Sequence, residues 1–198
     1  MKVKNLFALA LVFASVSAPA YAHPGHATHL GFMSGFIHPF SGIDHVIAMV
    51  AVGAYAAQLG GANLWRLPMA FMVVMMFGGL LGYSGVQLPM VEQAIGLSVV
   101  VMSIAVGAGW RLPGPAAACL VGAFALFHGQ AHGAEASRDS SFAAYALGFV
   151  PATAALHVAG LAAGLGFNEL HGRHAGWLRG AVGMWGAAAG IALLTGAL

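Results

Sequence analysis

The 198-residue sequence has very few charged residues: aspartate, glutamate, lysine and arginine together make up 6% of it. A soluble domain carries about 25%, so water is excluded as the solvent around most of this chain. Apolar residues make up 60% of the sequence, and its mean hydropathy is +0.87. These values predict one compact domain embedded in the lipid bilayer.

Cysteine and lysine are also scarce. The single cysteine, Cys119, lies in an apolar run, which excludes a disulfide framework and a cysteine-based metal site. Both lysines, Lys2 and Lys4, lie at the start, so no basic patch remains that would bind nucleic acid. The sequence also lacks the G-x-x-x-x-G-K-[ST] loop that would bind the phosphates of ATP.

Residues 1–22 have the pattern of a secretory signal peptide. A basic start precedes an apolar stretch at 6–16, and Ala20-Tyr21-Ala22 forms a small-x-small cleavage site. An uncleaved first helix is the alternative, but the apolar stretch is shorter than the roughly 20 residues that cross a bilayer. We therefore expect residues 1–22 to be removed, which leaves residues 23–198 as the transmembrane domain.

Six hydrophobic segments follow the predicted signal peptide. They cover residues 30–59, 65–84, 89–109, 114–134, 141–166 and 175–197. The breaks between them contain glycine, proline, asparagine or arginine, which favour turns, and lipid requires each span to be a helix with internally closed hydrogen bonds. The predicted fold class is all-α: a polytopic membrane helical bundle of about six transmembrane helices.

The first segment, 30–59, is too long for one straight span. It contains Pro39-Phe40-Ser41-Gly42, in which proline removes a helix hydrogen-bond donor and glycine loosens the backbone. We expect a broken first helix, with a half-helix that starts near Ser41 or Asp44. Such breaks at membrane depth are tolerated where they are buried in protein or line a cavity.

The arginines predict the orientation of the chain. If the mature N-terminus is outside, Arg138 is alone among the outer loops, and four arginines lie in the inner loops. The inner four are Arg66, Arg111, Arg173 and Arg179. This distribution agrees with the positive-inside rule and predicts a multi-pass protein of the inner membrane with both mature termini in the periplasm.

Small residues occur at helix-packing intervals in the last two segments. Three glycine pairs have a spacing of four residues: Gly160 and Gly164, Gly176 and Gly180, and Gly186 and Gly190. This spacing lets two helices approach closely. The contacts would lie within one bundle or between copies of the chain, so a homo-oligomer is one of two alternatives.

The stretch 128–135 holds the sharpest chemical pattern. At about 100° per residue, His128, His132 and Glu135 fall within about 60° of one another on one helical face. Ionisable residues inside a membrane are costly and by default mark a functional pathway. Two imidazoles and a carboxylate form a ligand set for a divalent transition metal ion. The alternative is a pair of hydrogen-bonded histidines that holds helices together.

The predicted helix break holds a second group of candidate ligands: His38, Asp44 and His45. Asp44 and His45 point about 100° apart on a helix, so we expect one to bind a metal ion and the other to orient it. The structural alternative is that Asp44 caps the half-helix that follows Gly42.

Three further places carry candidate ligands. His157 lies in the middle of the fifth segment, and the alternative to a ligand there is a buried histidine whose hydrogen bonds are made within the protein. Glu92 is near the start of the third segment, and the alternative there is a carboxylate at the membrane interface. After cleavage, the N-terminus would present a free amine and the imidazoles of His23, His26 and His29. These nitrogens suit Ni(II) or Cu(II) and predict metal capture outside the cell membrane; a polar tail is the alternative.

These motifs resemble the HupE/UreJ family of nickel and cobalt permeases. The residues that match are the runs 38–45 (HPFSGIDH), 48–53 (AMVAVG) and 127–135 (FHGQAHGAE), Glu92 ahead of Ser98, and the stretch 148–160. The resemblance covers essentially the whole mature chain. It implies uptake of Ni(II), or in some members Co(II), to supply hydrogenase or urease. Imidazole and carboxylate ligands also accept Cu(II) and Zn(II), so the residues alone leave the metal open.

The sequence thus predicts a secondary transporter, and not an enzyme, that carries a divalent metal ion from the periplasm to the cytoplasm without a prosthetic group. The two histidine motifs and Glu92 would form an outer or mid-membrane site, and His157 would continue the path inward. Two rivals use the same ligands. One is a membrane metallohydrolase or oxidase with an open metal position, and the other is a membrane metal-binding accessory protein.

Overall fold

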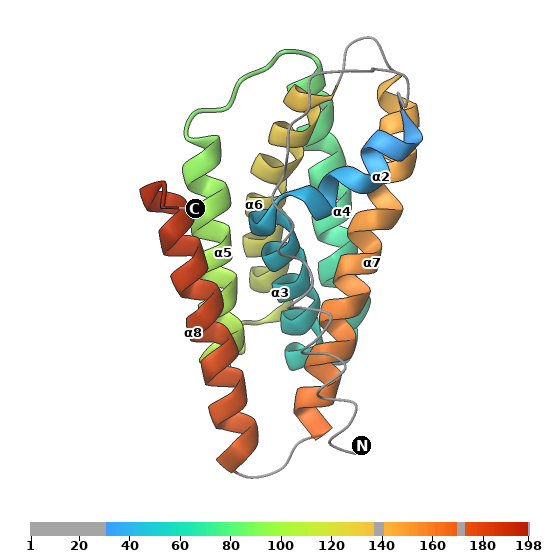
Figure 1. Ribbon diagram of the computed structural model, residues 1–198. Helices are drawn as coiled ribbons and strands as arrows, with labels where there is room; N and C mark the ends of the chain where they lie inside the picture. Colours follow the sequence, from blue (N-terminus) through green and yellow to red (C-terminus); the bar gives the residue numbers. More distant parts are fainter. Residues whose placement is uncertain (1–30, 137–140, 170–172, 198) are drawn as a thin grey trace.

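Figure 1 shows a computed structural model of the chain, which describes residues 31–136, 141–169 and 173–197. These residues form seven α-helices and no strand. The helices are α2 (Phe32–Ser41), α3 (Ile43–Leu59), α4 (Asn63–Tyr83), α5 (Val91–Gly107), α6 (Gly114–Glu135), α7 (Phe142–Glu169) and α8 (Arg173–Thr195). The predicted all-α helical bundle is confirmed. The predicted signal peptide, 1–22, lies outside the described residues.

The helices follow the six predicted segments, and the first segment is split in two. α2 and α3 together occupy 32–59, and each later segment contains one helix. The two halves meet at an angle of 84°. At the junction Gly42 has an extended backbone, with φ −103° and ψ 123°, and α3 begins at the next residue, Ile43. The broken first helix is therefore confirmed.

Length and hydropathy identify three of the described helices as membrane spans by themselves: α4, residues 142–167 of α7 and residues 176–195 of α8. The bent pair of α2 and α3 becomes a fourth if it is counted as one unit. α5 has 17 residues, fewer than the roughly 20 of an ordinary span. α6 is long enough, but His128, Gln130 and His132 lower its hydropathy. The residues that give α6 its chemistry are thus the ones that weaken its signal as a span.

Three helix pairs pack especially closely: α4 with α6, α3 with α7, and α5 with α8. Glycine makes this proximity possible. A Cβ atom on Gly133 would collide with the backbone carbonyl of Gly79, and a Cβ atom on Gly160 would collide with that of Val50. The backbones of α4 and α6 are therefore in direct contact next to the histidines of α6.

The three glycine pairs of the last two segments have different surroundings. The first pair, at 160 and 164, packs on α3, and the last pair, at 186 and 190, packs on α5. In the middle pair, a Cβ atom on Gly176 or Gly180 would meet no atom within 4 Å in the described part of the chain. The spacing correctly predicts close packing inside the bundle for the first and last pairs and not for the middle pair.

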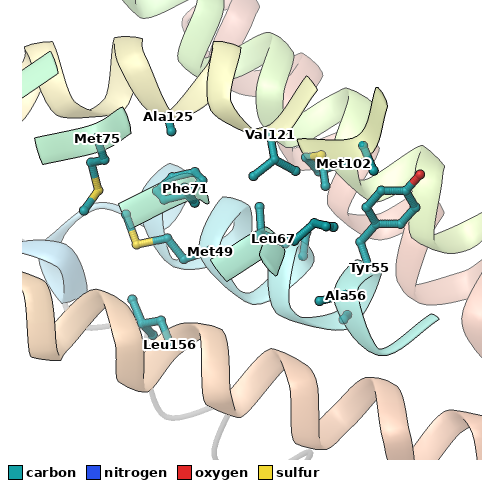
Figure 2. Close-up of a cluster of buried hydrophobic side chains, with 14 of the residues drawn as sticks. Met49, Tyr55, Ala56, Leu67, Phe71, Met75, Met102, Val121, Ala125 and Leu156 are labelled. Carbon is teal, nitrogen blue, oxygen red and sulfur yellow. The ribbon is translucent and has the colours of Figure 1, made fainter. Parts of the chain in front are cut away.

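The apolar core lies between α3, α4 and α6, with further side chains from α5 and α7 (Figure 2). Tyr55 and Phe71 are fully buried in it. The outer surface is apolar as well, since Phe77, Leu147 and Trp185 are each more than half exposed. A monomer in water rarely exposes so much apolar surface, and the apolar helices indicate a membrane protein.

Three arginines of the described part of the chain lie toward the end of the bundle where α5 leads into α6. Arg66 lies in the first turn of α4, with its guanidinium 5.5 Å from the ring centre of Trp65. Arg111 is in the connection between α5 and α6. Arg179 reaches the same connection, because a Cβ atom on Gly109 would lie 3.4 Å from its guanidinium. The histidine motif of α6 lies toward the opposite end, where α6 stops and α7 starts (Figure 1).

Glycines with the same spacing in the sequence should respond differently to a methyl group. Gly160→Ala should destabilise the fold by about 1–3 kcal/mol, because its Cβ meets the Val50 carbonyl. Gly180→Ala is the matched control; its stability should stay the same or rise slightly, since alanine favours helix and nothing opposes its Cβ. Thermal unfolding of the purified proteins in detergent measures the difference. Equal melting temperatures would contradict the close packing of α7 on α3.

Candidate metal site

The break between α2 and α3 brings polar side chains against the last turns of α6. His38 lies near the end of α2, and Asp44 and His45 lie in the first turn of α3. The 84° bend turns both helix ends toward α6. The side chains that they meet there are those of His128, His132 and Glu135.

His38, His132 and Glu135 form what we call the outer group. One possible ligand atom from each lies within 4.8 Å of the other two. His38 Nε2 is 3.0 Å from Glu135 Oε2, and the rings of His38 and His132 are 4.7 Å apart between centres. The Glu135 side chain is 60% exposed and that of His38 is 26% exposed, whereas His132 is buried. The outer group is thus accessible from one side and enclosed on the other.

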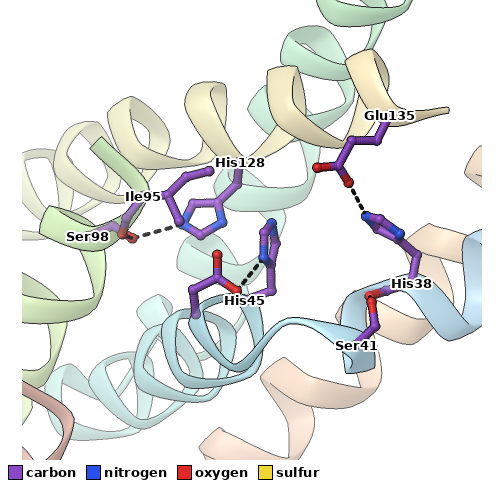
Figure 3. A network of polar contacts seen from close by, with 8 residues as sticks. His38, Ser41, His45, Ile95, Ser98, His128 and Glu135 are labelled. Carbon is purple, nitrogen blue, oxygen red and sulfur yellow. Dashed lines mark hydrogen bonds and ion pairs between the residues drawn. The ribbon is translucent and has the colours of Figure 1, made fainter. Parts of the chain in front are cut away.

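Asp44, His45 and His128 form what we call the inner group (Figure 3). The rings of His45 and His128 are 4.8 Å apart and almost perpendicular. His45 Nδ1 lies 2.9 Å from Asp44 Oδ1, so Nδ1 donates to the carboxylate and Nε2 carries no hydrogen in the neutral ring. The ring of His132 lies 4.2 Å from that of His45, and His132 therefore joins the two groups.

Asp44 does not act as the N-cap of α3. Gly42 holds that position, and no side chain caps the helix. A Cβ atom on Gly42 would lie 2.5 Å from Asp44 Oδ1 and 3.0 Å from His45 Nδ1, so glycine leaves room for the Asp44–His45 pair. A carboxylate that accepts a hydrogen bond from one ring nitrogen is the usual way to orient a histidine that binds metal through the other.

Several buried nitrogens of these groups have no hydrogen-bond partner in the described part of the chain. They are Nε2 of His45, Nδ1 of His128 and both ring nitrogens of His132. An unpaired buried polar atom costs about 1–3 kcal/mol, and lipid supplies no water to offset this. Neutral imidazole nitrogens together with carboxylates are donors that divalent transition metal ions accept. The donor set therefore fits a metal-binding site.

His157 is separated from the inner group by one aromatic ring. It is 2% exposed, and neither of its ring nitrogens has a partner among the described residues. Its ring lies 5.0 Å from that of Phe71, which in turn lies 5.8 Å from that of His128. His157 also borders a pocket of about 220 Å³ that opens to the surface, where Trp65 and Met69 are exposed.

The remaining predicted ligands are not part of the observed cluster. Glu92 is exposed in the first turn of α5 and makes no hydrogen bond or ion pair with another described residue. His23, His26 and His29 lie outside the described residues. A role in metal binding stays a prediction for all four.

Three side chains at the site were not singled out for their chemistry in the sequence. Ser98 Oγ lies 2.8 Å from His128 Nε2, the Tyr145 ring lies 6.0 Å from that of His38, and the Phe149 ring lies 4.2 Å from that of His132. α5 also contains Glu92, Gln93 and Ser103, so a hydroxyl there is a weak signal for Ser98. Tyr145 and Phe149 look like ordinary apolar positions one turn apart, and only Phe149 falls within the stretch 148–160 that resembles the family.

Known proteins match the chain over nearly its whole length. A family model described as "HupE / UreJ protein" matches residues 10–193. Protein HupE of Rhizobium leguminosarum bv. viciae is 44% identical over 185 residues, which are 92% of this chain and 95% of that protein. No solved structure matches significantly. The family match and the identity agree with the histidine motifs at the bend and at the end of α6, and the chain belongs to the HupE/UreJ family.

Proposed function

We propose that this protein is a secondary transporter that takes up divalent nickel, with cobalt as an alternative substrate, from the periplasm into the cytoplasm. Membership of the HupE/UreJ family supports a transporter of the nickel and cobalt type in general. One observation carries the proposal. Imidazoles in contact with one another lead from the exposed carboxylate of Glu135 to the fully buried ring of His128.

In this proposal the outer group binds the ion first. Its exposed carboxylate and the two imidazoles replace part of the ion's hydration shell. His132 then passes the ion to the inner group, since its ring contacts those of both His38 and His45. His157 would receive the ion next, and the ring of Phe71, which lies between His128 and His157, has to move for this step.

The ends of the path are inferred from the sequence. His23, His26 and His29 would collect the ion in the periplasm, and Glu92, exposed at the start of α5, would help attract it. In the cytoplasm the nickel would supply the maturation of hydrogenase or urease. The membrane potential can drive the movement, because two positive charges that cross about 100 mV gain about 4.6 kcal/mol.

Replacement of His132 should stop transport, because this residue belongs to the outer group and touches the inner one. In proteoliposomes, His132→Ala should lower the initial rate of nickel uptake at least tenfold. Cys119→Ala is the matched control, because it removes an exposed thiol, a group that in general can bind metal ions, from the same helix about three and a half turns earlier. Its rate should equal that of the wild type.

The same liposomes separate the proposal from its two rivals. A wild-type protein that binds nickel tightly and never moves it across the membrane would indicate a metal-binding accessory protein. An enzyme would convert a substrate at a metal with an open coordination position, and that turnover would not require nickel to accumulate inside the vesicles. Either result would overturn the transporter assignment.

Competition between metal ions should identify the substrate. Excess Co(II) should reduce the uptake of radioactive nickel, because both ions accept the same imidazole and carboxylate donors. Excess Mg(II) should not, since it prefers oxygen ligands and keeps its water. Elemental analysis of the vesicle contents then shows which ions cross. Faster accumulation of Cu(II) or Zn(II) than of Ni(II) would refute nickel as the substrate and leave the path itself intact.

The orientation can be tested with alkaline phosphatase, which needs the oxidising periplasm to form its disulfides. A fusion at the C-terminus should be active, because the arginine distribution places that end outside. A fusion at Arg111, between α5 and α6, is the control and should be inactive. The reverse pattern would place the outer group on the cytoplasmic side and would contradict uptake.

A further inference from the structure

Ser98 lies on α5 and is 1% exposed. Its hydroxyl oxygen makes two contacts: it lies 2.6 Å from the carbonyl oxygen of Ile95 and 2.8 Å from Nε2 of His128 (Figure 3). A serine in a membrane helix often bonds only to its own backbone. The second contact, across to α6, is what connects Ser98 to the inner group.

The two contacts determine where the hydrogens are. A hydroxyl has one hydrogen to donate, and the Ile95 carbonyl can only accept. Ser98 therefore donates to Ile95 and accepts from His128, which requires a hydrogen on His128 Nε2. In a neutral imidazole the other nitrogen, Nδ1, then carries a free lone pair.

That free lone pair lies in the inner group. Nδ1 of His128 is buried and has no partner among the described residues, and the ring faces that of His45 at 4.8 Å. His45 has the mirror arrangement: its Nδ1 donates to Asp44 and its buried Nε2 has no described partner. Figure 3 shows Nδ1 of His128 on the side of its ring toward His45, and each of the two rings makes its hydrogen bond through its other nitrogen.

We propose that Ser98 is a positioning residue, which holds His128 in the tautomer whose Nδ1 binds the transported metal ion together with Nε2 of His45. The inner group is then a second binding station beyond the outer group. Asp44 on α3 and Ser98 on α5 have the same role toward the two histidines. The inference rests on the proposed function for the identity of the ion, but the tautomer itself does not depend on it.

The metal-free wild type provides the first test. Protein labelled with ¹⁵N-histidine should show a His128 signal that is protonated at Nε2 and unprotonated at Nδ1, with the signal assigned by its loss in His128→Asn. A His128 ring that carries its hydrogen on Nδ1 would overturn the assignment. This measurement does not depend on the folding of any Ser98 variant.

The second test compares Ni(II) binding to purified variants by calorimetry. Ser98→Ala should raise the Kd about 10–100-fold, the usual effect of removing a partner of a metal ligand, and should give a mixture of His128 tautomers. Ser98→Thr keeps the hydroxyl and should restore both properties. Ser103→Ala is the control, since Ser103 is another buried hydroxyl on α5 and packs on α8 at Gly186. Its Kd should equal that of the wild type.

The outcomes are separable from those of the uptake experiments. A wild type that transports nickel while Ser98→Ala binds it with an unchanged Kd would overturn the role of Ser98 alone. Loss of binding in both Ser98→Ala and Ser98→Thr would also overturn it, because the effect would then be one of packing. A wild type that binds nickel without transporting it, with the expected tautomer and variant Kd values, would overturn the proposed function and support the role of Ser98.

Discussion

The 84° bend between α2 and α3 is the feature on which the whole site depends. In a straight helix, His38 and His45 would share a face about 10 Å apart along the axis, too far to enclose one side chain. With the bend, their rings lie 4.7 and 4.2 Å from the ring of His132. Gly42 permits this geometry, since its extended backbone ends α2 and the absence of a Cβ leaves space for Asp44 beside His45.

The bend would have little effect if α6 could move away from it. Gly129 and Gly133 lie beside the two histidines of α6, and a Cβ atom on either would collide with a carbonyl of α4. Backbone contact of this kind fixes the position of the α6 imidazoles along the helix axis, next to the bend between α2 and α3. α2 is held on its other side by α7, where Gly148 lies against the Phe32 carbonyl. Rigid helices therefore present every described ligand candidate, as an accurate binding site requires.

The site is exposed at Glu135 and fully buried at His128, but the histidines between them do not form a gradual series, since His132 is 2% exposed and the side chain of His45 is 12% exposed. Glu135 is 60% exposed, His38 is 26% exposed and His128 is fully buried. Buried nitrogens without described partners are unfavourable in a protein surrounded by lipid. Two of them, Nε2 of His45 and Nδ1 of His128, belong to rings whose other nitrogen contacts Asp44 or Ser98. In the proposed transport path, an ion would lose its water in steps as it moves between these helices.

The sequence by itself determined the solvent, the segments and the ligand types. Its hydropathy indicates lipid, the Pro39–Gly42 stretch predicts the break, and the helical period places His128, His132 and Glu135 on one face. All three are local properties of the chain. Only the tertiary structure decided how this face is divided: His132 and Glu135 meet His38, and His128 meets His45. It also decided that Ser98 of α5 meets His128 and that Glu92 stays exposed. These contacts join segments that are distant in the sequence, and the period of a single helix does not determine which other helix packs against it.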